Sequence, residues 1–281
     1  MSLINKIALG TVQFGLDYGI SNQSGRTSEK EVQDILSFVA QKGISVLDTA
    51  QAYGDSETVL GRYHENRFDI VTKIQVTAGG ESATELVKKS LDRLSLNSLY
   101  AVLFHNAESV LKNPDAYNEL NTLKERGIIC KTGCSVYTPK ELELLIDAFG
   151  NPDLIQVPFS HLDRRFEAMC TDLHKAGVEI HSRSTFLQGL LFMTSDEITP
   201  FFAPLEDYLK VLNTYFPNTI DKSAFLLNHV VAKPFVDKVV LGVNNIVQIE
   251  ENIEALKVDF HDVGIETVKV PDEILLPYLW Q

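Results

Sequence analysis

Short apolar runs alternate with amphipathic segments along this 281-residue chain. Runs that are apolar at nearly every position, rather than at every second one, are typical of parallel strands covered on both faces. Eight such runs predict strands. They are KIALGTVQF (6–14), ISVLDTA (44–50), FDIVTKI (68–74), LYAVLFH (99–105), IICKTGCS (128–135), LIQVPF (154–159), VEIHSRS (178–184) and KVVLGV (238–243).

The segments between these runs carry apolar residues at helical spacing. SEKEVQDILSFVAQKG starts with Ser28, a residue type that caps helix N-termini, and ends at Gly43; TPKELELLIDAFG runs in the same way from Thr138 to Gly150. Strand and helix alternate throughout, and no Pro/Gly/Ser-rich linker divides the chain. This pattern predicts a (β/α)8 TIM barrel that forms a single domain over residues 1–281.

An open, doubly wound sheet is the alternative α/β fold. Its dinucleotide-binding version needs a G-x-G-x-x-G turn directly after a strand, and Gly10, Gly15 and Gly19 do not have that spacing. The longest interval between predicted strands begins with TFLQGLLFMTSD (185–196). In a barrel this extra material would lie at the mouth, where active sites are found.

Composition and charge exclude some classes of partner. The chain is 44% hydrophobic and 22% charged, and its 25 Lys and Arg against 38 Asp and Glu give a net charge of −13. Such a surface repels phosphate backbones and anionic lipids, so we expect neither a nucleic acid nor a membrane partner. No apolar stretch is long enough for a signal peptide or a membrane span. A small anionic ligand in a local pocket stays compatible with this charge.

Three cysteines, Cys130, Cys134 and Cys170, show no paired spacing. On one strand, Cys130 and Cys134 would lie about 13 Å apart, too far for a disulfide. Reduced thiols are typical of cytoplasmic proteins, so we expect a cytoplasmic location. No His/Cys cluster has metal-ligand spacing, and we expect no metal at the site.

Titratable residues end three consecutive predicted strands. Asp48, Lys73 and His105 each continue the apolar face of their strand, and Tyr53 follows in the loop of VLDTAQAYGDSETVLG (46–61). Each residue alone has a structural explanation, as a turn aspartate, a solvated lysine, a histidine bonded to backbone or a packed tyrosine. Turn chemistry does not predict their coincidence at the end of a barrel where catalytic groups gather.

These segments resemble the aldo-keto reductase family, nearly from end to end of the chain. VLDTAQAYGDSETVLG is similar to the family's Asp…Tyr-Gly…Glu…Leu-Gly signature, and IVTK and LFHN are similar to its lysine and histidine segments. The resemblance implies that Asp48, Tyr53, Lys73 and His105 form a catalytic tetrad that reduces an aldehyde or ketone with a nicotinamide cofactor.

The chemistry explains why these residue types are needed. Carbonyl reduction needs a hydride at carbon, which a nicotinamide supplies, and a proton at oxygen. In this interpretation Tyr53 gives the proton, and the Lys73 ammonium lowers the phenol pKa by roughly 1–3 units. Asp48 pairs with Lys73, since a buried ammonium needs a partner. Neutral His105 donates a ring N–H to the substrate oxygen.

The same resemblance implies residues that bind the cofactor. GCSVYTP and LIQVPFS are similar to segments whose polar side chains hold the nicotinamide carboxamide, which gives Ser135 and Gln156, although Val136 stands where an asparagine is expected. Without the resemblance, Gln156 would be interpreted as a buried amide satisfied by backbone. VVLGVNNIVQIEEN is similar to the adenosine-phosphate segment, with Glu251 and Asn252 on the adenine side. The remaining cofactor candidates are Thr11, Asp48, Arg183, Ser184, Gly242 and Gln248.

Arg183 occupies the position at which the family usually carries an aromatic residue under the nicotinamide. Three roles stay open for it: stacking on the ring, a salt bridge at the barrel mouth, or contact with an acidic substrate. Many relatives hold the 2′-phosphate of NADP with a lysine near Gly242 and an arginine at the position of Gln248, and both cations are missing here. NADP is the expected cofactor, NAD stays possible, and main-chain N–H groups at a helix N-terminus could take the phosphate instead.

The leading hypothesis is a cytoplasmic NAD(P)H-dependent reductase of a small-molecule carbonyl substrate. GTVQFGLDYGISNQSG (10–25) resembles a bacterial branch associated with sugar pathways, which favours a sugar carbonyl. One alternative is a nucleotide-binding regulatory module of the same family with little turnover. Another is an unrelated barrel isomerase or lyase that uses Lys73 as a Schiff base, for which RSTFLQG is a poor phosphate turn. The C-terminal EILLPYLWQ could cover the barrel, line the pocket or contact a partner chain, and the oligomeric state is left open.

Overall fold

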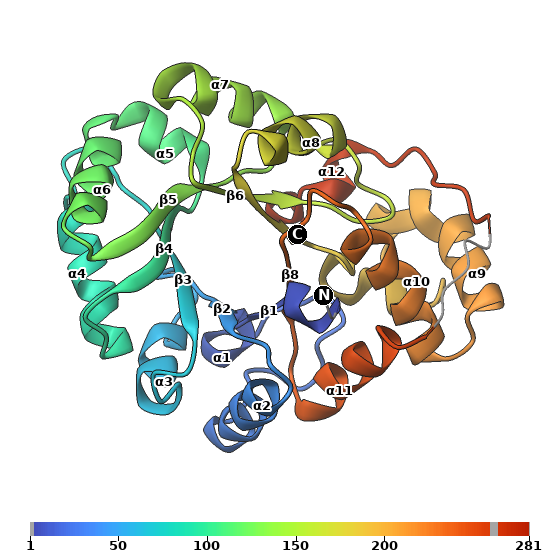
Figure 1. Cartoon of the computed structure of the whole chain (residues 1–281). Helices are drawn as coiled ribbons and strands as arrows, with labels where there is room; N and C mark the ends of the chain where they lie inside the picture. The colour runs from blue at the N-terminus through green and yellow to red at the C-terminus, as the bar shows by residue number, and fades with distance from the viewer. Residues whose placement is uncertain (1–2, 259–263, 281) are drawn as a thin grey trace.

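Eight parallel strands close into a barrel in the computed structural model, which describes residues 3–258 and 264–280 (Figure 1). Neighbouring strands pair in chain order, and β8 pairs with β1, so the sheet has no open edge. The expected (β/α)8 barrel is confirmed, and the doubly wound sheet is excluded. Residues 1–2 and 281, at the ends of the expected single domain, lie outside the described part. The strands are β1 (Ile7–Gly10), β2 (Val46–Asp48), β3 (Asp69–Ile74), β4 (Leu99–Phe104), β5 (Ile129–Ser135), β6 (Leu154–Pro158), β7 (Glu179–Arg183) and β8 (Lys238–Gly242).

Helices surround the barrel and connect successive strands (Figure 1). The α-helices are α1 (Val12–Gly15), α2 (Glu29–Gln41), α3 (Ser56–Tyr63), α4 (Ala83–Leu94), α5 (Ala107–Lys112), α6 (Asp115–Glu125), α7 (Pro139–Phe149), α8 (Glu167–Lys175), α9 (Glu206–Tyr215), α10 (Thr219–Val231), α11 (Ile246–Ala255) and α12 (Asp272–Leu275). Short 3-10 segments are η1 (Leu3–Lys6), η2 (Leu187–Phe192), η3 (Pro200–Leu205) and η4 (Pro277–Leu279). No helix in the described part of the chain is long and apolar enough to cross a membrane.

The predicted helix caps are confirmed. The Ser28 side chain accepts the backbone N–H of Glu31 at the start of α2, and the Thr138 side chain does the same for Glu141 at the start of α7. The first strand is shorter than expected, because β1 ends at Gly10 and the chain then turns into α1. The turn is fixed by Thr11, whose N–H and hydroxyl both donate to the carbonyl of Asp48.

Two hydrophobic layers explain why the polar residues meet. The larger one packs the helices against the outside of the barrel. The smaller one fills the barrel interior and consists of Ala8, Val46, Val71, Ala101, Leu103 and Leu154, with Tyr100 and Val240 beside it. Because side chains alternate along a strand, the next residues on this inner face after Val46, Val71 and Leu103 are Asp48, Lys73 and His105. The residues expected to form the tetrad therefore continue the interior of the barrel towards its C-terminal end.

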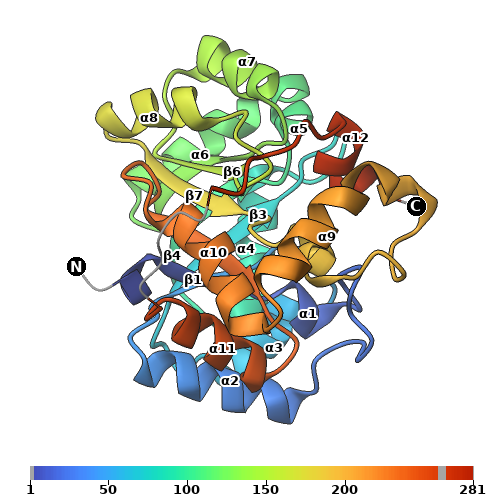
Figure 2. The same ribbon diagram turned by 90° about the vertical axis from the view of Figure 1, so that its right-hand side faces the viewer.

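The long interval between β7 and β8 builds a third apolar cluster beside the barrel. Leucines and aromatic residues of η2, η3, α9 and α10 pack there with Val270, Ile274 and Leu275 of the C-terminal segment. Figure 2 shows α9 and α12 on the same side of the molecule. The Trp280 ring contacts Phe202 edge-on, with ring centres 5.0 Å apart. The C-terminal segment thus packs against the elements that follow β7.

Gly133 offers a test of the barrel packing. A Cβ at this position would lie 1.6 Å from the carbonyl oxygen of Leu154 on β6, so Gly133→Ala forces the two strands apart. We expect the free energy of unfolding to fall by about 2–4 kcal/mol, measured by chemical unfolding followed by circular dichroism. Gly127→Ala is the control, because its Cβ meets open space and only the left-handed backbone, at φ +70°, costs about 1 kcal/mol. Equal losses in the two variants would contradict the close approach of β5 and β6.

Candidate active site

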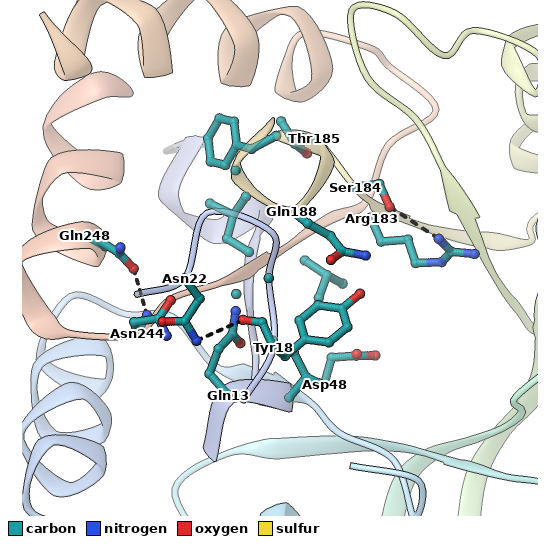
Figure 3. Close-up of a pocket in the computed structure, with 18 of the residues that line it drawn as sticks. Gln13, Tyr18, Asn22, Asp48, Arg183, Ser184, Thr185, Gln188, Asn244 and Gln248 are labelled. Atoms are coloured by element: carbon teal, nitrogen blue, oxygen red, sulfur yellow. Dashed lines mark hydrogen bonds between the residues drawn. The ribbon is translucent and has the colours of Figure 1, made fainter. Parts of the chain in front are cut away.

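A cavity of about 370 Å³ opens at the C-terminal ends of the strands. Figure 3 shows side chains from several parts of the chain that line it. Of the candidate site residues, all but Lys73 line this cavity: Thr11, Asp48, Tyr53, His105, Ser135, Gln156, Arg183, Ser184, Gly242, Gln248, Glu251 and Asn252. The structure therefore brings together residues that are more than 200 positions apart in the sequence.

Asp48 and Lys73 form a buried ion pair between adjacent strands. The Lys73 ammonium donates to Asp48 Oδ1 at 2.5 Å and to the carbonyl of Thr49 at 3.1 Å. Lys73 is 1% exposed and Asp48 is 2% exposed. Burial lowers the pKa of Lys73, and the charge of Asp48 acts against that effect. Asp48 lines the cavity, whereas Lys73 is not among its lining residues.

The Tyr53 hydroxyl lies next to this pair, 3.5 Å from Lys73 Nζ. Two glycines permit this position, because α1 and the Tyr53 turn pack backbone against backbone. A Cβ on Gly15 would lie 1.8 Å from the carbonyl oxygen of Tyr53, and one on Gly54 would lie 2.5 Å from the carbonyl oxygen of Gly15. Gly54 also has a left-handed backbone, with φ +54°. The segment 46–61 therefore needs Gly54 for the turn that positions the Tyr53 hydroxyl.

The pKa of Tyr53 is raised in this structure, and the expectation that Lys73 lowers it is wrong for the free protein. Burial of the phenol is the main cause, the negative charge of Asp48 adds to it, and Arg183 acts in the opposite direction. The physical reason is that the Lys73 charge is already neutralised by Asp48. The phenol therefore faces a neutral ion pair in a poorly hydrated site, which favours its uncharged form.

His105 follows β4 directly and faces the tyrosine. Its backbone N–H donates to the carbonyl of Ile74, and its ring meets the Tyr53 ring edge-on, with centres 5.7 Å apart. Burial, assisted by the positive charge of Lys73, lowers the pKa of His105 to about 4. The imidazole is consequently neutral at physiological pH, so one ring nitrogen carries a proton and can donate it.

Gln156 contacts the ion pair rather than backbone. Its side-chain nitrogen donates to Asp48 Oδ2 at 2.7 Å, so both oxygens of this carboxylate are engaged. Ser135, the last residue of β5, is 3% exposed and lines the cavity beside it. The side chain of Val136 is buried and apolar, and its carbonyl accepts a hydrogen bond from Arg183.

Arg183 lies over an aromatic ring. Its guanidinium carbon lies 4.1 Å from the centre of the Tyr137 ring, and Nη2 donates to the carbonyl of Val136 at 3.0 Å. Nη1 donates to Ser184 Oγ at 3.3 Å (Figure 3). The salt bridge proposed from the sequence is not formed with any carboxylate in residues 3–258 and 264–280.

The other end of the cavity is bordered by the start of α11. Gly242, Gln248, Glu251 and Asn252 line it. The nearby backbone N–H groups are bonded within the protein, because Ile246 donates to Glu31 Oε1 at 2.6 Å, and Gln248 donates to Asn245 Oδ1 at 3.0 Å. The Asn244 N–H donates to Gln248 Oε1 at 2.7 Å (Figure 3). This end therefore offers neither a cation nor vacant N–H groups at these positions.

Several lining residues were missed in the sequence. Gln13 is 7% exposed, and its Oε1 has no hydrogen-bond partner in the described part of the chain. It lies against Gly242, where an added Cβ would be 2.8 Å from Gln13 Nε2. Tyr18, Tyr137 and Gln188 also line the cavity. Tyr137 lies two residues after Ser135 in GCSVYTP, but nothing in the sequence indicated which way its ring points.

Comparisons with known proteins agree with this geometry. The sequence profile described as "Aldo/keto reductase family" matches residues 6–270. An uncharacterised oxidoreductase of Bacillus subtilis, YqkF, is 25% identical over 283 aligned positions, which cover 90% of this chain and 91% of that protein. D-arabinose 1-dehydrogenase of Saccharomyces cerevisiae is 31% identical to this chain over a local match of 123 positions. That match covers 38% of this chain and 36% of that protein.

Solved structures show the same fold. A putative aldo-keto reductase from Pseudomonas aeruginosa superposes with a TM-score of 0.68 at 24% identity and covers 90% of both chains. An aldo-keto reductase from Bacillus halodurans, solved in its holo form, gives a TM-score of 0.68 at 23% identity over 90% of this chain and 87% of that one. The profile match spans nearly the whole chain, and the barrel agrees with it. The chain belongs to the aldo/keto reductase family of NAD(P)H-dependent oxidoreductases.

Proposed function

We propose that this protein reduces an aldehyde or ketone, with a sugar carbonyl as one candidate, to the alcohol, and that Tyr53 is the proton donor. One observation carries the proposal: the Tyr53 hydroxyl, the Lys73–Asp48 pair and the His105 ring meet beside one cavity. A regulatory module with little turnover needs the nucleotide but not a proton donor. The assembled acid therefore supports turnover over that alternative.

The cavity fits a nicotinamide dinucleotide. The unpartnered Gln13 Oε1 and the side-chain-free Gly242 border its far end, and polar groups line its length. We assign Ser135, Gln156 and Ser184 to the nicotinamide end. Gly242, Gln248, Glu251 and Asn252 would hold the adenosine end. The hydroxyl of Thr11 is already bonded to the carbonyl of Asp48 and lies 2.8 Å from Ser56 Oγ, so Thr11 would serve as a wall that also fixes Asp48.

The chain's own residues would handle the proton. A bound reduced nicotinamide supplies the hydride. As the hydride adds to the carbonyl carbon, the Tyr53 hydroxyl gives its proton to the carbonyl oxygen, and the raised pKa of Tyr53 keeps that proton in place until then. Lys73, whose ammonium already donates to the Tyr53 hydroxyl oxygen at 3.5 Å, would donate a hydrogen bond to the phenolate that remains. Neutral His105 donates a hydrogen bond to the carbonyl oxygen and orients it.

The position of Lys73 argues against Schiff-base chemistry. A lysine that forms a Schiff base must reach the substrate carbonyl with its amine. Lys73 is 1% exposed, donates to Asp48, and is not among the residues that line the cavity. Its place supports a role through Tyr53 and not as a nucleophile.

We propose that both NADPH and NADH are accepted. NADP is the expected cofactor by resemblance, but no lysine or arginine other than Arg183 is among the described lining residues. The N-terminus of α11 is also bonded internally, once to the carboxylate of Glu31. A 2′-phosphate gains little at such a terminus, which supports weak discrimination. We further propose a cytoplasmic location, supported by three free cysteines.

Tyr53→Phe tests the assigned proton donor. Loss of the hydroxyl should lower kcat for an aldehyde by about 100- to 10,000-fold, followed by the absorbance of reduced nicotinamide. The affinity for the nucleotide, measured by isothermal titration calorimetry, should change little. Tyr63→Phe, which removes a hydroxyl bonded to Glu29 on the outside of the barrel, is the control. Unchanged turnover in Tyr53→Phe would remove Tyr53 from the mechanism.

The pKa of His105 gives a pH prediction. The folded protein holds this pKa at about 4, below its ordinary value of 6.5. Between these two pH values His105 is protonated in the unfolded chain but neutral in the folded protein. The free energy of unfolding should therefore fall as the pH drops from about 6.5 to about 4. The penalty is absent at neutral pH and complete below pH 4. An NMR titration, with the signal assigned through His105→Asn, measures it directly. A ring that titrates near 6.5 would contradict the burial of His105.

Nucleotide choice can be measured by binding alone. Calorimetry should give dissociation constants for NADPH and NADH within about tenfold of each other. Gln248→Arg should then lower the dissociation constant of NADPH by about tenfold at low salt without changing that of NADH. Gln41→Arg adds the same charge at the far end of α2 and is the control. A wild-type preference for NADPH above about a hundredfold would contradict weak discrimination.

A further inference from the structure

Arg183 is a cation in the cavity, and no carboxylate in residues 3–258 and 264–280 forms a salt bridge with it. It is the only lysine or arginine among the lining residues that the structure describes, and it donates hydrogen bonds to the carbonyl of Val136 and the hydroxyl of Ser184. The Asp48 charge is taken up by Lys73, which leaves the substrate end of the cavity positive. This local excess contrasts with the net charge of −13 of the whole chain.

The positive charge is close to the reacting groups. The positive charge of Arg183 acts to lower the pKa values of Tyr53, Lys73 and His105, because it disfavours their protonated forms. The guanidinium ends β7, on the same rim of the barrel as Asp48 and Gln156. A group bound to Arg183 would therefore face the same cavity as a carbonyl held at Tyr53 and His105.

The surroundings of Arg183 hold its guanidinium in one orientation. The Tyr137 ring covers one face, and that ring is contacted edge-on by Tyr278, with centres 4.8 Å apart. Pro277 and Tyr18 also line the cavity. The bonds to Val136 and Ser184 leave further N–H groups of the guanidinium for a ligand. A planar, pre-oriented set of donors of this kind matches a carboxylate.

We propose that the substrate is an anionic carbonyl compound, an aldehyde or ketone with a carboxylate that binds Arg183. This inference rests on the proposed reductase function and names its substrate class. Stacking on the nicotinamide is the competing role for Arg183. A fixed cation against the ring would oppose the positive charge that the ring acquires on oxidation, whereas a substrate carboxylate would neutralise the cation. The carboxylate would also supply the anionic partner that Arg183 lacks among residues 3–258 and 264–280.

The experiment compares terephthalaldehydic acid with its methyl ester, two aldehydes that differ in one charge. In the wild-type protein, kcat/KM should be about tenfold or more higher for the acid. Arg183→Gln should lower kcat/KM for the acid by about 10- to 100-fold and leave the ester within about threefold. Arg183→Lys keeps the charge and should retain most of the preference for the acid. Arg126→Gln removes a charge from the exposed end of α6 and should change neither substrate.

A binding measurement makes the result independent of turnover. With the protein saturated with oxidised nucleotide, benzoate should raise the melting temperature more than benzamide does, and Arg183→Gln should abolish the difference. If Arg183→Gln lowers kcat/KM equally for the acid and the ester, the proposal is overturned in favour of a contact between Arg183 and the nicotinamide. Absence of turnover with both aldehydes would count against the proposed function instead, and the comparison of benzoate with benzamide would still decide whether Arg183 binds a carboxylate.

Discussion

The arrangement of this site depends on the ion pair between Asp48 and Lys73. A charged lysine inside a barrel is stable only if a partner compensates its lost hydration, and Asp48 does so at 2.5 Å. The pair in turn fixes other groups, because Gln156 donates to the second carboxylate oxygen and the Tyr53 hydroxyl lies 3.5 Å from the ammonium. One electrostatic requirement therefore orders side chains from β2, β3 and β6 and the loop after β2.

Neutralisation within the pair sets the charge of the rest of the cavity. The phenol of Tyr53 and the imidazole of His105 both face a site in which their uncharged forms are favoured. Arg183 is then the charge that remains at the substrate end, and its guanidinium lies over the Tyr137 ring. The opposite end, at the start of α11, is polar, and the N–H groups of Ile246 and Gln248 there are bonded internally. The cavity thus has two chemically different ends, which suits a long cofactor and a separate small substrate.

Close approach of backbone shapes the walls of this cavity. Gly15 and Gly54 let α1 and the Tyr53 turn touch, and Gly242 leaves room for the side chain of Gln13. The segment after β7 and the C-terminal segment add Gln188 and Pro277 to the wall. These parts are not barrel strands, yet they decide how much of the mouth is closed.

The sequence by itself determined the barrel, because continuous apolar runs and capped amphipathic segments reflect burial that is set locally, and the alternation of side chains along a strand placed Asp48, Lys73 and His105 on the inner face. It also marked residues at both ends of the cavity, through short segments that resemble a family. It did not determine the raised pKa of Tyr53, the bond from Gln156 to Asp48 or the stacking of Arg183 on Tyr137. Only the tertiary structure decided these, because desolvation and side-chain pairing depend on atoms that distant parts of the chain bring together.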